Sequence, residues 1–287
     1  MKGHLLKCAK PIPARWRKDY SGVERVYPCG KCKSCRINLR RKKAARFLLE
    51  QRFTDGESTF ATVTYDDEHV PTVRGVDGCP VRTVRPRDMQ LLIKKLRNKA
   101  ARRFRHVYVG EYGDKSGRPH YHALIYGLGP DELKGLLGRS WDAGFVQVAE
   151  LTDARAAYTA GYTAKKMTKA DDERLVAGQH PEFMRQSLRP PIGCTEAVLA
   201  YLEELYYTEA GSKWLTQGTG IAPVIRLGGK VMPLDRTVVG KVNERLGVKK
   251  YGPVPEGVEA LPPEELLHAM AVEARLERRD ERRSGIL

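Results

Sequence analysis

The sequence lacks long apolar segments. Its opening residues, Met-Lys-Gly-His-Leu-Leu-Lys, do not contain the apolar core of a secretory signal peptide, and no run reaches the roughly 18–20 apolar residues that cross a bilayer. We therefore expect a protein without membrane segments, in a cytoplasm whose reducing conditions keep thiols free. Its 287 residues are enough for one large domain or two smaller ones.

Acidic residues are scarce at the N-terminal end. Residues 1–52 contain three Asp or Glu and sixteen Lys or Arg, a net charge of +13 out of +16 for the whole chain. A charge run is usually a solvated face, but this excess favours a polyanionic partner. Nucleic acid is favoured over anionic lipid because no membrane-binding element accompanies it. The side chains expected to bind nucleic-acid phosphates are Arg36, Arg40, Arg41, Lys42, Lys43 and, farther along, Arg118.

Four of the six cysteines lie near the N-terminus, at Cys8, Cys29, Cys32 and Cys35. Four thiolates are a suitable ligand set for a structural Zn²⁺ ion. The spacing of three residues also resembles part of an iron–sulfur pattern, although the closing Cys-Pro is missing, and free thiols are a third alternative. We favour zinc because a segment this polar has little apolar surface on which to fold.

Hydrophobic periodicity predicts an alternation of strands and helices in the middle of the chain. The predicted strands are 59–65, 106–112, 120–126 and 145–151, and the predicted helices are 39–53, 87–104, 130–141 and 154–168. This order describes an α+β fold, an antiparallel sheet with flanking helices, preceded by a Cys-rich basic module. We expect three regions: the basic module at 1–55, a central domain at 56–170 and a C-terminal helical accessory region at 171–287.

Two histidines separated by one residue begin a predicted strand. Side chains alternate between the faces of a strand, so His120 and His122 point to the same side. If the strands at 106–112 and 120–126 form a hairpin, Glu111 lies beside them. Two imidazoles and a carboxylate leave positions open for water and a phosphate oxygen, which suits a divalent ion such as Mg²⁺ or Mn²⁺. The alternative is a chance His-x-His on a sheet surface.

Two tyrosines lie four residues apart in the last predicted helix of the central region. At this spacing Tyr158 and Tyr162 share a face, and Lys165 and Lys166 add positive charge beyond them. A tyrosine oxygen can attack an activated phosphate and form a covalent phosphotyrosine. Aromatic packing of the helix against the sheet is the alternative, but the combination with the histidine motif favours phosphodiester chemistry.

These motifs together resemble the HUH endonuclease superfamily. They are Phe-Ala-Thr-Val-Thr-Tyr at 60–65, Gly-Glu-Tyr-Gly at 110–113, Arg-Pro-His-Tyr-His at 118–122 and Tyr-Thr-Ala-Gly-Tyr-Thr-Ala-Lys-Lys at 158–166. More closely, the chain resembles the replication initiator proteins of small single-stranded DNA microviruses, especially the gokushovirus branch. Cys-Gly-Lys-Cys-Lys-Ser-Cys-Arg at 29–36 is similar to that branch as well. The likeness covers about residues 8–193.

The resemblance implies an HUH/RRM-like nuclease core that nicks single-stranded DNA at a viral origin in the bacterial host cytoplasm. A tyrosine would be joined to the 5′ phosphate, leaving a 3′ hydroxyl as primer for rolling-circle replication, and two tyrosines would alternate in cutting and rejoining. By motif, Glu111, His120 and His122 match the metal ligands, Tyr158 and Tyr162 the nucleophiles, and Lys166 with Lys165 the neighbouring lysine. Host helicase and polymerase are implied partners.

The sequence departs from this family at two places. Gly161 lies between the tyrosines, where some relatives carry lysine, and residues 188–193 match a downstream motif only in part. Two other functions remain open: a non-enzymatic binder that uses the sheet as a stacking platform for single strands, and a transposase or relaxase of the same superfamily. The paired tyrosines and the cysteine segment favour the initiator over the transposase.

Overall fold

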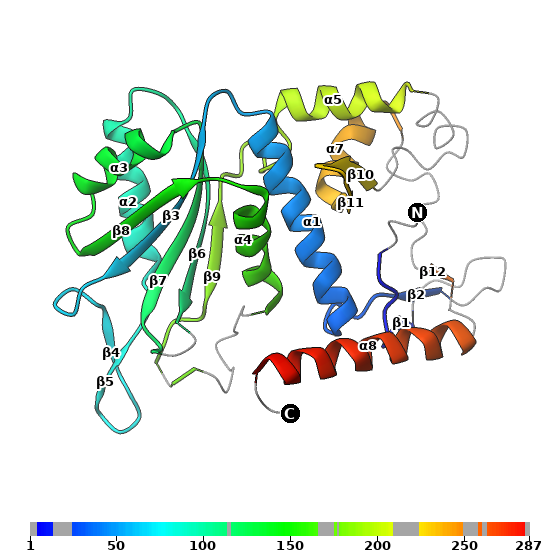
Figure 1. The fold of residues 1–287 in the computed structure, drawn as a ribbon, viewed down its shortest axis with the longest axis horizontal. Coiled ribbons are helices and arrows are strands. Elements are labelled where there is room, and N and C mark those ends of the chain that lie inside the picture. The colour runs from blue at the N-terminus through cyan, green and yellow to red at the C-terminus, as the bar shows by residue number, and fades with distance from the viewer. Residues whose placement is uncertain are drawn as a thin grey trace. The chain divides into compact units, whose positions relative to one another are not determined.

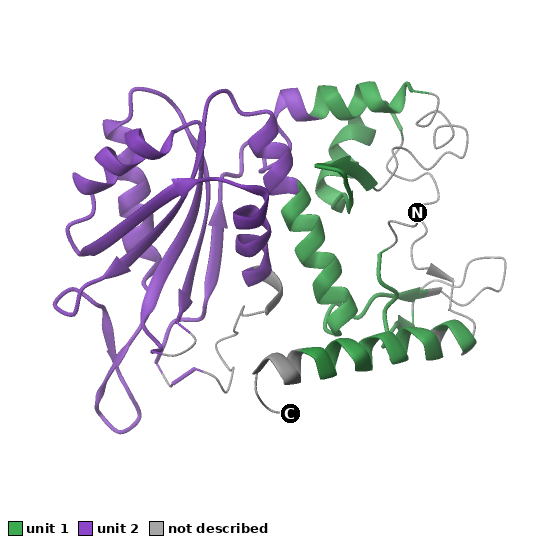
Figure 2. Ribbon diagram, viewed as in Figure 1, with its two compact units in different colours: residues 1–45, 199–287 green, residues 46–198 purple. Residues whose placement is uncertain are grey.

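The computed structural model describes residues 5–13, 25–113, 116–165, 175–176, 178–208, 224–248, 258–259 and 263–284 (Figure 1). The chain forms two compact units (Figure 2). The terminal unit combines residues 1–45 with 199–287, and the sheet unit contains residues 46–198. These units cut the chain differently from the three expected regions, because both ends of the chain contribute to one unit. Among the described helices, none has the length and apolar character that a bilayer span requires.

A five-stranded antiparallel sheet forms the centre of the sheet unit. Its strand order is β8-β3-β7-β6-β9. The strands are β3 (Ser58–Tyr65), β6 (Arg105–Tyr112), β7 (Pro119–Tyr126), β8 (Gly144–Glu150) and β9 (Phe183–Gln186). With its flanking helices, this sheet confirms the expected α+β fold. β9 lies after residue 170, so the predicted boundary there would remove an edge strand from the sheet.

Helices α2 (Pro86–Lys99) and α3 (Pro130–Gly138) cover one face of this sheet (Figure 1). A proline in the first turn begins each helix, where its missing N–H costs no hydrogen bond. The apolar stripe of α2 packs with α3 against alternate residues of the central strands. This core includes Met89, Leu92, Ile93 and Leu96 of α2, Leu133 and Leu137 of α3, and Ala61, Val63, Tyr121, Ala123 and Ile125 of the strands.

Helix α4 (Asp153–Lys165) lies on the other side of the sheet and contacts β7 (Figure 1). Two fully buried alanines, Ala156 and Ala160, let its backbone approach closely. Helix α1 (Lys33–Arg52) is shared, and its last turns belong to the sheet unit. There the fully buried Glu50 carboxylate pairs with Arg105 and accepts a hydrogen bond of 2.6 Å from the backbone N–H of Gly193.

A short hairpin occupies the stretch between β3 and α2. The segment 66–86, expected to be a loop, contains β4 (Thr72–Arg74) and β5 (Pro80–Arg82), which pair antiparallel. These strands have only three residues each, too few for a clear alternation of polar and apolar side chains.

The terminal unit consists of small sheets and helices. β1 (Ile12–Pro13), β2 (Arg25–Tyr27) and β12 (Val258–Glu259) form one sheet, and β10 (Val224–Leu227) and β11 (Lys230–Pro233) form a hairpin where only a turn was expected. The helices are the early turns of α1, α5 (Glu196–Tyr206, which begins in the sheet unit), α7 (Arg236–Arg245) and α8 (Pro263–Ser284). α8 confirms the helix expected at the C-terminal end.

Candidate active site

The pairing of β6 with β7 places a carboxylate directly opposite a histidine. Glu111 is the register partner of His120, and Val109 is the partner of His122. Side chains two residues apart share a face, so Glu111, His120 and His122 all lie on the face opposite the α2 and α3 core. The predicted hairpin therefore brings these three residues together.

The carboxylate of Glu111 contacts both imidazoles. Its Oε1 lies 2.7 Å from His120 Nε2 and 3.0 Å from His122 Nε2. Glu111 and His122 are buried, whereas His120 is half-buried. Burial alone would raise the pKa of Glu111, but hydrogen bonds with His120 and His122 lower it to about 2. The carboxylate is therefore ionised at neutral pH.

The outer nitrogen of each imidazole is held by a neighbouring group. His120 Nδ1 lies 3.1 Å from the backbone oxygen of Arg118, and His122 Nδ1 lies 3.1 Å from the hydroxyl of Thr62. A carbonyl oxygen only accepts, so Nδ1 of His120 carries a proton and a neutral ring directs its Nε2 lone pair at Glu111. Two such acceptors lie close only if a proton or a cation lies between them. Two imidazole nitrogens and one carboxylate, so oriented, fit a divalent metal ion.

Both tyrosines of α4 lie against these metal-ligand candidates. The ring of Tyr162 stacks on His122, with centroids 5.5 Å apart and an angle of 21°, and Tyr158 meets His122 edge-on at 5.5 Å. The Tyr162 hydroxyl donates a hydrogen bond to the Tyr158 hydroxyl. Five residues from three elements thus form one cluster.

The two tyrosines differ in their surroundings. Tyr158 is 49% exposed, whereas Tyr162 is 8% exposed. Burial raises the pKa of Tyr162, and its hydrogen bond with Tyr158 and the nearby negative charge of Glu111 raise it further. Tyr162 is therefore a neutral hydrogen-bond donor at physiological pH, and Tyr158 has the more accessible hydroxyl.

The expected lysines beside the tyrosines lie outside the described residues. Helix α4 is described as far as Lys165, whose side chain is not described, and Lys166 lies beyond it. Arg118, expected to bind DNA, donates hydrogen bonds of 2.6 and 3.2 Å to the backbone oxygen of Tyr65 and one of 2.7 Å to Asp67. Its guanidinium therefore links the start of β7 to the end of β3.

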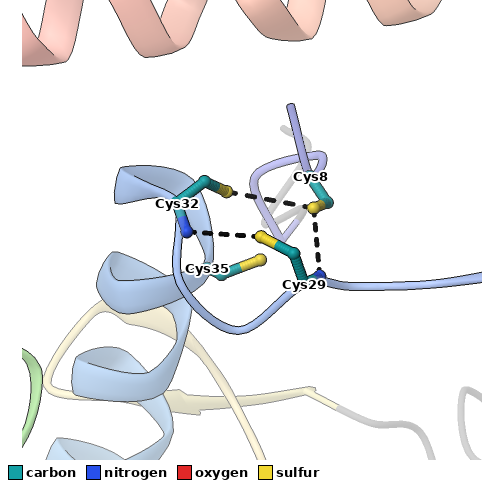
Figure 3. A group of neighbouring side chains, drawn as sticks. All are labelled: Cys8, Cys29, Cys32 and Cys35. Atoms are coloured by element: carbon teal, nitrogen blue, oxygen red, sulfur yellow. Dashed lines mark hydrogen bonds between the residues drawn. The ribbon is translucent and has the colours of Figure 1, made fainter. Parts of the chain in front are cut away.

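The other expected DNA contacts lie on α1 within the terminal unit. Arg36 is exposed and donates to the backbone oxygen of Lys31, while Arg41 donates to the backbone oxygen of Val231. Arg40 is exposed, and Lys42 and Lys43 are half-buried. The four N-terminal cysteines lie in the same unit and also come together (Figure 3).

Sequence reasoning missed two residues beside His122. Phe60 stacks on its ring at 5.4 Å, and the Thr62 hydroxyl contacts its Nδ1. Both belong to β3, on which Thr62 is the register partner of His122. The alternation of β3 places residues 60 and 62 on one face, but only the β3–β7 pairing shows that this is the histidine face.

Residues 58–170 match a family model that describes the replication-associated protein ORF2 and its relatives. This span contains all five residues of the cluster. The chain is similar to phage replication-associated proteins. It is 34% identical over 170 residues to replication-associated protein VP4 of Bdellovibrio phage phiMH2K, covering 52% of this chain and 51% of that protein. It is 35% identical over 179 residues to replication-associated protein ORF2 of Spiroplasma virus 4, covering 56% and 54%.

A third phage replication-associated protein, ORF4 of Chlamydia phage 1, is 29% identical over 163 residues, covering 50% of this chain and 39% of that protein. These matches confirm the likeness to microvirus replication proteins that the motifs predict. The chain spans about half the length, or less, of these curated relatives. No solved structure matches it.

Proposed function

We propose that this chain is a replication initiator that nicks and rejoins single-stranded DNA through a phosphotyrosine intermediate. The observation that carries the proposal is the contact of two α4 tyrosines with the Glu111, His120 and His122 cluster. A nucleophile and a metal-ligand set within one cluster are what tyrosine-dependent phosphodiester cleavage needs. The similarity to phage replication-associated proteins supports the same role.

Glu111, His120 and His122 would hold one Mg²⁺ or Mn²⁺ ion. When bound, such an ion polarises the scissile phosphate and offsets the charge that develops on its oxygens. The Arg118 backbone oxygen and the Thr62 hydroxyl would keep the two imidazoles oriented toward it. The low pKa of Glu111 keeps its carboxylate available as a ligand throughout the neutral range.

We infer that Tyr158 makes the first bond. Its oxygen attacks phosphorus, the bond from phosphorus to the 3′ oxygen breaks, and the released 3′ oxygen takes a proton, so the DNA 5′ phosphate becomes a tyrosyl ester. Tyr158 is the more exposed tyrosine, and its oxygen already accepts a hydrogen bond from Tyr162. That bond stabilises negative charge on Tyr158 when its own proton leaves. Tyr162, with its raised pKa, is the nucleophile of the second cleavage.

A cleavage assay tests the nickase. Single-stranded oligonucleotides that tile the genome encoding this chain are incubated with the protein and Mn²⁺ or Mg²⁺, and adducts are separated on denaturing gels. We expect a covalent adduct that requires metal and is absent from a Tyr158→Phe, Tyr162→Phe double variant. His120→Ala with His122→Ala would abolish the adduct but leave most DNA binding, since affinity for DNA rests mainly on basic residues. Binding without any adduct would instead support the non-enzymatic binder.

Single variants test the order of the tyrosines. In one turnover, Tyr158→Phe is expected to reduce adduct formation at least tenfold, whereas Tyr162→Phe leaves it near the wild-type level. A substrate carrying two origins would show the reverse dependence for the second cut and for joining. Equal losses in both single variants at the first cut would contradict the order while leaving the nickase proposal intact.

A further inference from the structure

The four N-terminal cysteines converge from three parts of the terminal unit. Cys8 belongs to the N-terminal segment, Cys29 and Cys32 to the turn before α1, and Cys35 to the first turn of that helix (Figure 3). Their sulfur atoms all lie within 4.8 Å of one another, and those of Cys8 and Cys32 are 3.9 Å apart. All four are free thiols, and Cys32 and Cys35 are buried. No residue of the nicking cluster takes part.

The spacing of the sulfurs fits a single ion. Zinc–sulfur bonds of about 2.3 Å in a tetrahedron place the sulfurs about 3.8 Å apart. The observed separations therefore need only a small contraction. A four-iron cluster carries its thiolates on the outside of a cube, so its cysteine sulfurs lie farther apart than those around one ion. The geometry thus decides between the two kinds of centre that the spacing in the sequence left open.

Backbone amides point at two of the sulfurs. The N–H groups of Lys31 and Cys32 lie 3.4 and 3.3 Å from the sulfur of Cys29, and the N–H of Cys29 lies 3.2 Å from the sulfur of Cys8. The turn depends on Gly30, whose φ of +72° is unfavourable for other residues. Amide donors stabilise a thiolate, the form that binds metal. Burial would raise the pKa of the Cys29 thiol, but the amides of Cys32 and Lys31 lower it to about 7.

The charge around the cluster suits a tetrathiolate centre. Four thiolates with one Zn²⁺ carry a net charge of −2, and the adjoining sequence is rich in cations: Lys7, Lys10, Lys31, Lys33 and Arg36. Helix α1 begins at Lys33, so the positive end of its dipole lies at Cys32 and Cys35. This environment offsets the negative charge that four thiolates would concentrate in a small volume.

We propose that Cys8, Cys29, Cys32 and Cys35 bind one structural Zn²⁺ ion that fixes the N-terminal segment to the start of α1. The start of α1 is also joined to α8, because the buried Glu273 carboxylate accepts hydrogen bonds from the amides of Lys33 and Ser34 and from the Ser34 hydroxyl. The ion and Glu273 would together connect three segments that are distant in sequence. The centre is structural, because four thiolates leave no open coordination position.

Cobalt substitution of the full-length protein tests the proposal. Co²⁺ bound by four thiolates gives intense sulfur-to-cobalt charge-transfer absorption and tetrahedral visible bands, which histidine and carboxylate ligands do not give. We expect both signals at one equivalent, and their displacement by one equivalent of Zn²⁺. The Glu111→Gln variant would retain them in full, which separates this centre from the nicking site. Absence of the thiolate bands from the wild type would overturn the proposal.

Matched serine variants identify the ligands. Cys32→Ser and Cys35→Ser are expected to lower zinc affinity at least tenfold, whereas Cys79→Ser, on the exposed β4–β5 turn, leaves it unchanged. Alkylation of the wild-type protein gives a readout that needs no variant to fold: four thiols would be protected with zinc and become reactive after chelation. Iron with acid-labile sulfide, or equal alkylation of all six cysteines before and after chelation, would refute a zinc centre.

Discussion

Buried His106 makes the stability of the sheet unit sensitive to mild acid. It lies on β6 with 7% of its surface exposed, and its Nδ1 is 3.4 Å from the guanidinium of Arg97. Burial, together with the positive charges of Arg97 and Arg105, lowers its pKa from 6.5 to about 4. The folded protein therefore keeps this imidazole neutral at a pH where the unfolded chain protonates it.

The sign and size of the effect follow from proton binding. Between pH 6.5 and 4 the unfolded state holds more protons at this position, so the stability that His106 supports above this range is lost as the pH falls. A pKa difference of about 2.5 units corresponds to about 3 kcal/mol over the full window. Between pH 7 and pH 5 the loss attributable to His106 is about 2 kcal/mol.

Urea unfolding of the wild type and of His106→Asn measures this term. Asparagine can present an acceptor near the position of Nδ1 but does not titrate, and Trp141 reports on the sheet unit because it packs against Tyr65. The wild type should lose about 2 kcal/mol more than the variant between pH 7 and pH 5. His69 provides a control of opposite sign, because its hydrogen bond with Asp66 raises its pKa. Equal pH dependence of wild type and His106→Asn would refute the reasoning.

Two further substitutions probe the fold and the metal-ligand geometry. Gly193→Ala would place its Cβ 2.7 Å from a backbone oxygen of α1, so it should cost about 1–3 kcal/mol more in urea unfolding than Gly56→Ala, which has a similar positive φ in open space. Equal costs would show that α1 yields to the added methyl group. Thr62→Val removes the hydroxyl beside His122 Nδ1 and should weaken Mn²⁺ binding about 10–100-fold in calorimetry. Thr64→Val, one position along the same face, should leave it unchanged, and equal weakening would contradict an orienting role for Thr62.

The central hairpin was predictable because its information is local. Strands expected at 106–112 and 120–126 are found at 105–112 and 119–126, and their pairing alone places Glu111 opposite His120. Helical spacing likewise predicts that Tyr158 and Tyr162 share a face. Which of the two is buried was not predictable, because both obey the same spacing and only the docking of α4 on the sheet separates them.

Elements that depend on distant partners were not predictable. β9 has four residues and becomes a strand by pairing with β6, so no alternation in its own sequence identifies it. Helix α1 begins at Lys33 rather than near residue 39, where the apolar pattern starts. Its polar first turn is held by Glu273, a residue 239 positions beyond Ser34 along the chain. Such a long-range cap leaves no signal in the helix sequence.

The register of β6 and β7 links the fold of the sheet to its chemistry. A slip of one residue would move Glu111 to the opposite face from His120 and His122 and would destroy the cluster. The same slip would expose the apolar side chains that α2 and α3 bury, Tyr121 and Ile125 among them. Packing on one face therefore enforces the alignment of ligands on the other, so the residues that determine the geometry of the nicking site include many that never touch it.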